Sequence, residues 1–433
     1  MTVYGLSKKQ WLQVFAAWSG WLMDGYTTIM YALLAVTLST IMFPSTIGVW
    51  ALVATFGGFA VGGVARSIGS LVLGNFLGDK LGRRNMLLFT VLGFSILSAS
   101  KGLIPTYSSI GIAAPVILYV ILWFEGMFAG AEYGGGTALS MESVPAERRS
   151  FIGSFVQSGY GTGYFVISFV LAAFTLLFRK DFNIVGWRYL FGTALIIGAM
   201  VLILRLMSTE TKIFEEMVGK REISKVPLKD LFKFSPYAVI MALLITTGLL
   251  FVNTATFSFY PTVILLKGIS LTKMSEASGI INLVSLFGVW IGGAIANSIG
   301  GGRKRPMLIY SVVFIVSIYP ILYLAMHTTN ILLIGTYFSI QAFLEAMIFS
   351  TLPALLSEQF SKKYRVTGVG FTYNGGAIVG AWAISLIVAS SSFLGLLTSW
   401  FVWMLAFSIV MIIGVLLIRE TWKKDQKEDL MER

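Results

Sequence analysis

A series of long apolar stretches separated by short polar loops constrains this chain more than any other feature. One helical crossing of a bilayer core about 30 Å thick needs roughly 20 apolar residues. Of the 433 residues, 56% are hydrophobic and 12% are charged, whereas an ordinary soluble domain carries roughly 25% charged residues. The pattern predicts an all-α integral membrane protein with twelve transmembrane helices, located in the cell membrane as a multi-pass protein.

The predicted spans form two sets of six. Windows of about 19 residues place the first set near 12–40, 49–78, 86–104, 112–140, 151–178 and 187–207. The second set lies near 236–265, 276–299, 306–326, 331–357, 365–391 and 396–418. We therefore divide the chain into an N-terminal six-helix bundle, a cytoplasmic linker, a C-terminal six-helix bundle and a cytoplasmic tail, at 1–207, 208–234, 235–419 and 420–433.

Lys and Arg gather in alternate loops, which indicates how the chain is oriented. The richer side carries the termini, the linker and Lys8, Lys9, Lys80, Arg83, Arg84, Arg148, Arg149, Arg303, Lys304, Arg305, Lys362, Lys363, Arg365, Lys423 and Lys424. The opposite loops carry Lys101, Arg179, Lys180, Arg188, Lys267 and Lys273. Because cytoplasmic loops are rich in Lys and Arg, we expect both termini in the cytoplasm. This distribution also argues against nucleic acid as a partner, since a nucleic-acid-binding domain gathers its basic residues into one patch on a soluble fold.

A weak internal repeat relates the two halves. A shift of 216 residues superposes Ala138-Leu139-x-x-Glu142 on Ala354-Leu355-x-x-Glu358, and it places Arg149 on Arg365. Parallel repeats of six helices are one known way to build a secondary transporter. The repeat therefore favours a protein with two similar six-helix halves.

The residue types exclude several kinds of chemistry. The chain has no cysteine and a single histidine, His327, so we expect no thiolate or histidine metal site and no cofactor. A phosphate-binding loop of the Gly-x-x-x-x-Gly-Lys-Ser/Thr type is absent from the sequence, which disfavours direct use of ATP. We expect a monomeric transporter driven by an ion or solute gradient, and not an enzyme.

Several motifs resemble those of known transporters. The segment Gly78-Asp79-Lys80-Leu81-Gly82-Arg83-Arg84 resembles the loop between helices two and three of the major facilitator superfamily. Arg66-Ser67-Ile68-Gly69 and Gly130-Ala131-Glu132-Tyr133-Gly134-Gly135 resemble stretches of its metabolite:proton symporter family, as do Pro353-Ala354-Leu355-Leu356-Ser357-Glu358 and Tyr373-Asn374. The resemblance implies the major facilitator fold and proton-coupled transport of an organic acid or related metabolite.

The resemblance also implies gate residues at the cytoplasmic mouth. They are Asp79, Arg83, Arg84, Glu142, Arg149, Glu358 and Arg365. Two departures from the pattern bear on function. Asp24-Gly25-Tyr26-Thr27 resembles an Asp-Gly-Tyr-Asp motif of related organic-acid carriers, but Thr27 replaces its second acid. Ser67 stands where the family usually has proline.

Five ionisable residues stand out within the predicted spans, where a charge costs roughly 2.5 to 3.5 kcal/mol on insertion scales. Each is therefore a functional candidate. We predict proton coupling for Asp24, Glu125, Glu132 and Glu345, and substrate binding for Arg66. Glu125 and Glu132 are seven residues apart, so they lie on one helical face and are expected to share a cavity.

Two interpretations of Arg66 remain open. Its planar fork of donors matches a carboxylate, which suggests an organic anion as substrate; alternatively it forms an internal ion pair with Asp24, Glu125 or Glu132. For Glu132, a role in close helix packing is an equal alternative to proton carriage. Further substrate contacts are predicted from the mid-span polar groups Tyr26, Tyr31, Gln157, Asn253, Tyr260, Gln341, Tyr373 and Asn374.

The leading functional hypothesis is a secondary active transporter that moves a small organic solute with protons by alternating access. A proton-independent uniporter or an exporter of the same fold is the nearest alternative, because the acid expected at Thr27 is missing. A channel and a membrane-embedded enzyme are the other classes considered. The two-half repeat argues against a channel, and the lack of a clustered catalytic motif argues against an enzyme.

Overall fold

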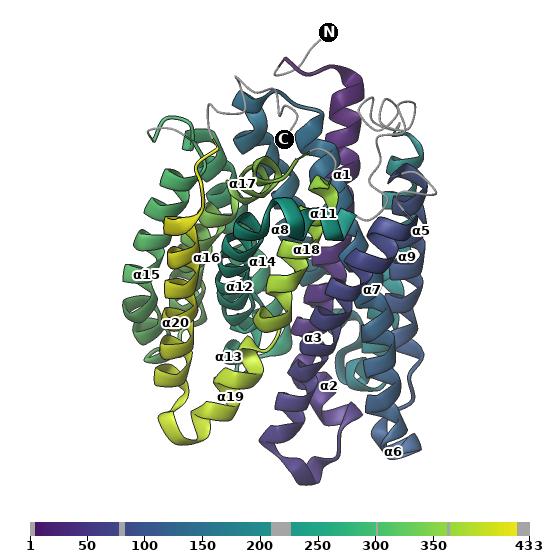
Figure 1. Ribbon diagram of the computed structural model, residues 1–433. Helices are drawn as coiled ribbons and strands as arrows, with labels where there is room; N and C mark the ends of the chain where they lie inside the picture. The colour runs from purple at the N-terminus through teal and green to yellow at the C-terminus, as the bar shows by residue number, and fades with distance from the viewer. Residues whose placement is uncertain (1–4, 78–82, 209–226, 300–301, 362–363, 422–433) are drawn as a thin grey trace.

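The computed structural model describes residues 5–77, 83–208, 227–299, 302–361 and 364–421 (Figure 1). Side chains are described throughout these ranges except at 74–77, 83–86 and 227. The described chain is built of helices and has no β-strand. The predicted all-α architecture is therefore confirmed.

The helices follow the predicted spans closely, with several spans broken into two parts. The first half contains α1 (Lys8–Leu33), α2 (Ala35–Met42), α3 (Val49–Gly69), α5 (Arg83–Ser100), α6 (Tyr107–Ile110), α7 (Ala113–Glu142), α8 (Arg149–Phe178) and α9 (Trp187–Leu206). The second half begins with α11 (Pro227–Phe234), α12 (Pro236–Asn253), α13 (Tyr260–Leu266), α14 (Leu271–Ile295) and α15 (Lys304–Met326). It ends with α16 (Ile331–Phe349), α17 (Leu352–Gln359), α18 (Arg365–Gly380), α19 (Ala383–Leu394) and α20 (Leu396–Leu417).

By length and composition, nine helices of the described chain can cross a membrane, or ten if the bent pair α1 and α2 forms one span. One of the nine, Ala146–Leu206, is 61 residues long and contains both α8 and α9. A further apolar helix, Leu87–Leu103, is shorter than the others. These helices are compatible with twelve crossings, which stays a prediction.

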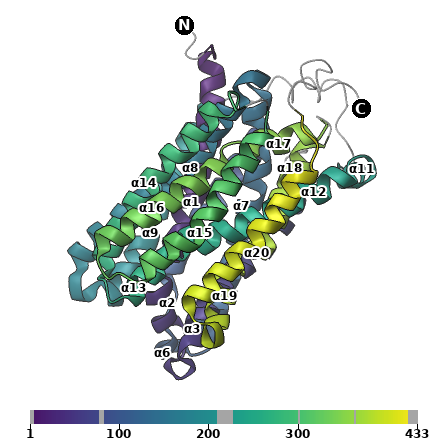
Figure 2. The ribbon, with the colours of Figure 1, turned by 90° about the vertical axis from the view of Figure 1, so that its left-hand side faces the viewer.

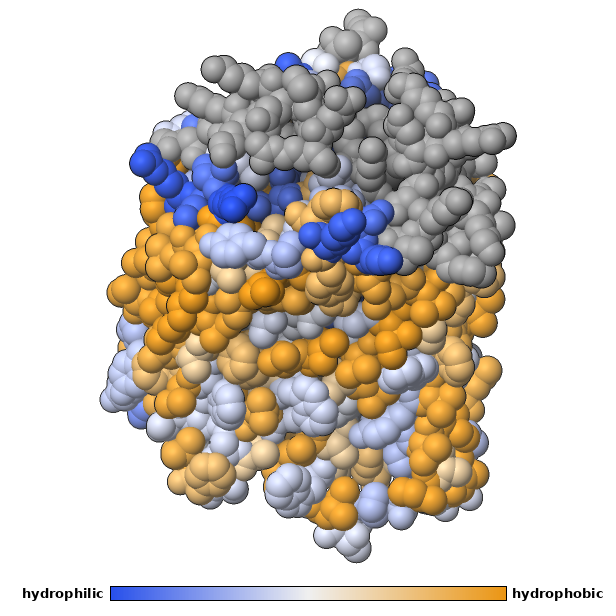
Figure 3. All heavy atoms as spheres, viewed as in Figure 1, coloured by the Kyte–Doolittle hydropathy of each residue, from blue (hydrophilic) through white to orange (hydrophobic). Residues whose placement is uncertain are grey.

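The two described ends of the chain lie at the same end of the bundle (Figure 1). We call this the basic end; it carries the start of α1 at Lys8 and the end of α17, near Glu358. Hydrophilic side chains gather there, above a broad band of apolar residues (Figure 3). This placement agrees with the expectation that both termini share one side of the membrane.

The halves meet along two long seams. In one seam α8 packs against α14, and in the other α18 packs against α3 and α7 (Figures 1 and 2). Gly134 on α7 approaches Gly370 on α18 so closely that a Cβ at Gly134 would lie 3.0 Å from the Gly370 Cα and 2.9 Å from the Val366 carbonyl oxygen. Small residues therefore allow the backbones of the two halves to touch.

A break in the seventh predicted span shapes the centre of the second half. After α12 the chain forms a π-helical turn over Thr254–Ser258 before α13 starts at Tyr260. Pro261 lies in the first turn of α13. Because proline has no N–H, it cannot donate a hydrogen bond to a carbonyl of the preceding turn. Because π-turns widen a helix locally and are frequent at functional sites, this break draws attention to the residues beside it.

Candidate functional site

A cavity of about 180 Å³ lies between the two halves near the middle of the bundle. Its charged lining residues are Asp24, Arg66, Lys101 and Glu125, and all four belong to the first half. The second half contributes only neutral polar groups, from Asn253, Thr254, Asn282, Ser285 and Tyr373, together with apolar side chains. Charge is therefore confined to one wall of the cavity.

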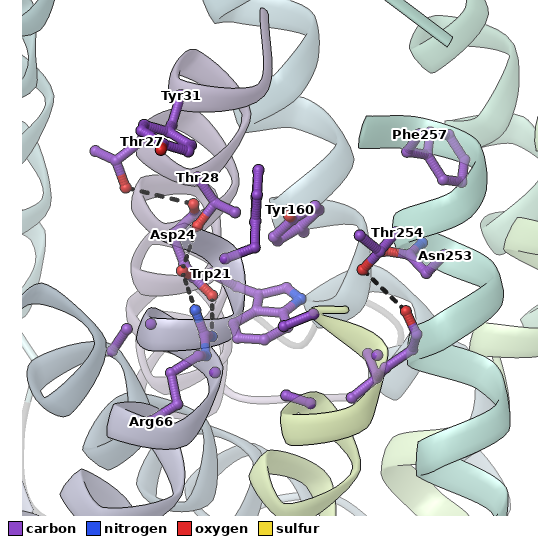
Figure 4. A pocket seen from close by; sticks show the side chains of 18 of the residues that line it. Trp21, Asp24, Thr27, Thr28, Tyr31, Arg66, Tyr160, Asn253, Thr254 and Phe257 are labelled. Carbon is purple, nitrogen blue, oxygen red and sulfur yellow. Dashed lines mark hydrogen bonds and ion pairs between the residues drawn. The ribbon is translucent and has the colours of Figure 1, made fainter. Parts of the chain in front are cut away.

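Arg66 and Asp24 form a two-pronged ion pair in this wall. The guanidinium Nη1 donates to Asp24 Oδ1 at 2.8 Å, and Nη2 donates to Oδ2 at 2.5 Å (Figure 4). Thr28, one turn further along α1, donates its hydroxyl to Asp24 Oδ1 at 3.1 Å. Both residues line the cavity. The Arg66 side chain is 15% exposed and Asp24 is 1% exposed, so the arginine presents the larger surface to the cavity.

Glycine on α7 fixes the position of Arg66. A Cβ at Gly130 would collide with the Arg66 carbonyl oxygen, and one at Gly126 would meet the Gly62 carbonyl oxygen at 2.5 Å. The backbones of α3 and α7 therefore pass in direct contact at the level of Arg66. The glycine-containing motif around Glu132 thus acts on the site through the neighbouring helix.

A second buried ion pair, which does not follow from the sequence pattern, lines the same wall. Lys101 Nζ donates to both carboxylate oxygens of Glu125, at 3.0 and 2.8 Å, and only 1% of the lysine side chain is exposed. The ammonium also lies 5.9 Å from the centre of the Tyr31 ring and 5.1 Å from that of Phe191. The assignment of Lys101 to an external loop is therefore wrong: the helical chain continues to Leu103 and turns the lysine inward.

Glu132 does not share the cavity with Glu125, contrary to the prediction. Its carboxylate forms an ion pair with Arg205 on α9 and accepts a hydrogen bond from Thr90 at 3.2 Å. Arg205 also donates to the Leu87 carbonyl oxygen at 2.6 Å. This buried cluster joins α5, α7 and α9, which corresponds to the packing alternative for Glu132. An arginine in the last turn of the sixth predicted span was the available sequence signal for it.

Glu345 is fully buried on α16 and lies behind the cavity wall. Asn253 donates its amide to Glu345 Oε1 at 3.0 Å, and the Thr256 hydroxyl donates to Oε2. Asn253 itself lines the cavity. The carboxyl group thus contacts the cavity through one side chain.

The structure brings together part of the predicted substrate-binding set. Tyr31, Gln157, Asn253 and Tyr373 line the cavity with Arg66. Tyr160, which also lines it, lies beside Trp21.

Four predicted substrate contacts, Tyr26, Tyr260, Gln341 and Asn374, lie outside the cavity lining. The Tyr26 hydroxyl is 2.6 Å from the Thr193 hydroxyl, and Tyr260 donates to Gln341 Oε1 at 2.8 Å. The Asn374 side chain donates to the Gly130 carbonyl oxygen at 3.1 Å, and the Asn374 backbone carbonyl oxygen accepts from Ser67 at 2.7 Å. In this arrangement the four side chains contact neighbouring helices.

Two ion pairs connect the halves at the basic end. Glu142 lies 3.7 Å from Arg365, and Arg149 lies 3.5 Å from Glu358. The internal repeat relates Glu142 to Glu358 and Arg149 to Arg365. The repeat therefore pairs the acid of each half with the arginine of the other half.

Arg303 strengthens this contact from the second half. Its fully buried side chain donates to Glu358 at 2.8 Å, to the Ser150 hydroxyl at 2.6 Å and to the Ala146 carbonyl oxygen at 2.9 Å. From its sequence pattern, Arg303 is expected only to orient the chain in the membrane. Asp79 and the side chains of Arg83 and Arg84 lie outside the part of the chain that the structure describes.

Comparison with known proteins identifies the family of this chain. Residues 59–384 match the Major Facilitator Superfamily profile. The inner membrane metabolite transport protein YhjE of Escherichia coli (strain K12) is 29% identical over 356 residues, covering 81% of this chain and 80% of that protein. The shikimate transporter of the same organism is 26% identical over 424 residues, covering 94% of this chain and 93% of that protein. The proline/betaine transporter of E. coli (strain K12) is 33% identical over 210 residues, covering 48% of this chain and 42% of that protein.

Solved structures with the same fold are also found. The crystal structure of a D-xylose-proton symporter superposes with a TM-score of 0.73 at 17% sequence identity, covering 96% of this chain and 99% of that one. A partially occluded inward open conformation of the xylose transporter XylE from E. coli gives a TM-score of 0.76 at 16% identity, with the same coverage. At these identities the structures establish the fold alone, whereas the profile match covers most of the chain. This chain belongs to the major facilitator superfamily and is a multi-pass membrane transporter, not an enzyme.

Proposed function

We propose that the protein transports a small organic carboxylate together with protons by alternating access. The observation that carries this proposal is the Arg66–Asp24 ion pair in the cavity wall. Arg66 reaches the cavity surface, and its guanidinium already holds a carboxylate with two hydrogen bonds. A carboxylate of the substrate has the same geometry as the Asp24 side chain that Arg66 binds.

Exchange of these two carboxylates couples substrate to proton. When the substrate takes over Arg66, Asp24 is left as a buried charge, and among the described residues the Thr28 hydroxyl is the side chain that still donates a hydrogen bond to it. Removing one partner of a buried pair costs about 3 to 5 kcal/mol, and binding a proton to Asp24 removes that charge. Substrate and proton therefore enter the cavity together, and re-formation of the Arg66–Asp24 pair releases both.

The neutral wall of the second half sets the rest of the specificity. Its amide and hydroxyl groups, from Asn253, Thr254, Asn282 and Ser285, suit the hydroxyl groups or short apolar body of a metabolite. Shikimate, proline and betaine, after which the related transporters are named, all carry one carboxylate. We therefore propose monocarboxylates of this size as the first test compounds.

The ion pairs at the basic end form the gate. In the described conformation Glu142–Arg365 and Arg149–Glu358 hold the halves together there, and opening the cavity to that side requires both pairs to separate. Interface ion pairs that repack between two states are a known switching device. The gate residues and the cavity residues therefore act in alternation.

A proton-independent uniporter or an exporter is the second candidate, and a specific observation favours it. Thr27 stands where related carriers have an acid, and its hydroxyl bonds to the Met23 carbonyl oxygen at 3.1 Å. In that case the Arg66–Asp24 pair would exchange with substrate without taking a proton.

Uptake into proteoliposomes separates the candidates. With labelled shikimate and proline outside, we expect uptake to accelerate when the external medium is made acidic relative to the lumen. Arg66→Lys should weaken uptake and Arg66→Ala should abolish it while the protein still inserts. Asp24→Asn should retain exchange of labelled for unlabelled solute and lose the response to the pH gradient. Uptake that ignores the gradient in the unaltered protein would eliminate symport in favour of the uniporter.

A further inference from the structure

Glu345 differs from the other buried acids of the bundle in its partners. Asp24, Glu125 and Glu132 each form an ion pair with Arg66, Lys101 or Arg205. Glu345 accepts hydrogen bonds from the neutral side chains Asn253 and Thr256, and in the described ranges no Lys, Arg or His forms an ion pair with it. Its side chain is 0% exposed. An ionised Glu345 is therefore a buried charge without a compensating cation.

The helices around Glu345 do not supply another charge. Tyr260 on α13 is the titratable group that faces it, and the Tyr260 hydroxyl donates its hydrogen bond to Gln341 Oε1. On α14 the charged residues, Lys273 and Glu276, both lie in the first two turns, and α12 has none. On α15 the only charged residues are Lys304 and Arg305, at its start, and Tyr310 bonds to a backbone carbonyl. Because an unpaired buried charge is strongly unfavourable, a proton is the partner that completes this site.

Asn253 connects that proton to the cavity. An ionised carboxylate only accepts hydrogen bonds, so Asn253 must direct its NH₂ group toward Glu345. Asn253 lines the cavity, and its Nδ2 is directed to Glu345, so its side-chain oxygen is the amide atom left for the cavity. The oxygen therefore faces the cavity as an acceptor while Glu345 is ionised.

We propose that Glu345 binds a proton and that Asn253 transmits its protonation state to the cavity. The Asn253 amide turns over when Glu345 takes up a proton. A protonated carboxyl group can donate, so the Asn253 oxygen can turn to accept from it and the NH₂ group then faces the cavity. The same position changes from a hydrogen-bond acceptor to a donor. Glu345 acts as a positioning residue, since it reaches the cavity only through Asn253.

The consequence for transport rests on the proposed function. Asn253 and Thr254 lie across the cavity from the Asp24–Arg66 pair (Figure 4). With Glu345 ionised, the Asn253 oxygen disfavours a hydrogen-bond acceptor at the end of the substrate that is remote from Arg66; with Glu345 protonated, the Asn253 amide donates to that acceptor. One such hydrogen bond corresponds to a change in affinity of up to about tenfold. Acidic medium therefore raises affinity for the transported anion through the second half, independently of Asp24.

The first experiment needs no solute. Infrared difference spectra of the purified full chain are recorded as the pH is lowered, for the unaltered protein, Glu345→Gln, Asp24→Asn and the exposed control Glu276→Gln. We expect a protonated-carboxyl band that Glu345→Gln removes and that the other two variants keep. Asn253→Ala should shift this band, because it removes a hydrogen-bond partner. A band that persists unchanged in Glu345→Gln overturns the proposal, whether or not the protein transports a carboxylate.

The second experiment tests the role of Asn253. The pH dependence of KM is measured for whichever of shikimate and proline is taken up, with Asn253→Ala and Thr256→Val compared. Asn253→Ala should abolish the approximately tenfold fall of KM in acid that one hydrogen bond provides, while Thr256→Val should keep it. The opposite pattern places the proton between Glu345 and Thr256 and removes Asn253 from the switch. In a further outcome, Asp24→Asn loses the response of uptake to the pH gradient while Asn253→Ala keeps the full pH dependence of KM. That combination would support the proposed function and reject this inference alone.

Discussion

Among the described residues, each buried acid of the first half forms an ion pair with one cation, so it is sensitive to the loss of that neighbour. Lys101 and Glu125 are both buried and bonded to each other at 2.8 and 3.0 Å. We expect Lys101→Met to destabilise the protein by about 3 to 5 kcal/mol, because it leaves the Glu125 charge unpaired. The double variant Lys101→Met with Glu125→Gln should recover most of this loss, and melting curves in detergent measure both. Equal loss in the single and double variants would mean that the pair does not hold charge as described.

Gly130 is a residue whose missing side chain positions a charged one. A Cβ at Gly130 would collide with the Arg66 carbonyl oxygen, so Gly130→Ala must push α3 away from α7 and move Arg66. We expect carboxylate uptake to fall at least tenfold, since small displacements at a binding site are costly. Gly192→Ala is the matched control, because a Cβ there meets nothing within 4 Å. Proteoliposome uptake by the two variants, at equal reconstituted amounts, makes the comparison.

At the scale of elements, the loop before α15 and the end of α17 form one unit at the basic end. Arg303 bonds Glu358, and both contact the first half through Ala146, Ser150 or Arg149. Glu358 also accepts from Thr421, just after α20, at 2.9 Å. The acid therefore connects three segments of the second half with α8.

Loss of that acid should loosen the basic end. We expect Glu358→Gln to raise the fraction of molecules that are open there, because neutral Gln removes two charge-assisted contacts. The chain has no cysteine, so a single Ser158→Cys in the cavity lining reports access by a membrane-impermeant maleimide applied from the basic end. Labelling should be faster in Glu358→Gln than in the exposed control Glu276→Gln. Unchanged labelling would assign Glu358 to stability and not to the gate.

At the scale of the whole molecule, the internal repeat relates the two ion pairs that join the halves at the basic end, Glu142–Arg365 and Arg149–Glu358. Glu358 also binds Arg303. The exchange Arg149→Glu with Glu358→Arg should therefore fail to restore the uptake that either single change removes, because it places a cation against Arg303. Proteoliposome uptake measures this, and full rescue by the exchange would contradict the role of Arg303.

Some individual contacts followed from the pattern and others did not. Asp24 is one of three partners that the sequence allows for Arg66. The structure shows that Arg66 on α3 pairs with Asp24 on α1. The count of loop cations includes Lys101, although the residue lies near the end of the predicted span 86–104, and the seven-residue spacing predicts that Glu132 shares the cavity with Glu125. In both cases the direction of a side chain depended on a neighbouring helix, α7 for Lys101 and α9 for Glu132.

The sequence by itself determined that the chain is a helical membrane protein with two similar halves, because apolar length and the distribution of Lys and Arg are local properties that lipid and water select directly. It also identified the buried acids Asp24, Glu125, Glu132 and Glu345, since a charge is costly in a span, but not the buried cations Lys101, Arg205 and Arg303. Only the tertiary structure decided which charges pair, which of them reach the cavity, and that the second half contributes neutral groups alone. Those outcomes depend on contacts between helices hundreds of residues apart, such as the hydrogen bond from Asn374 to Gly130, and helical periodicity carries no information about which helix a given face will meet.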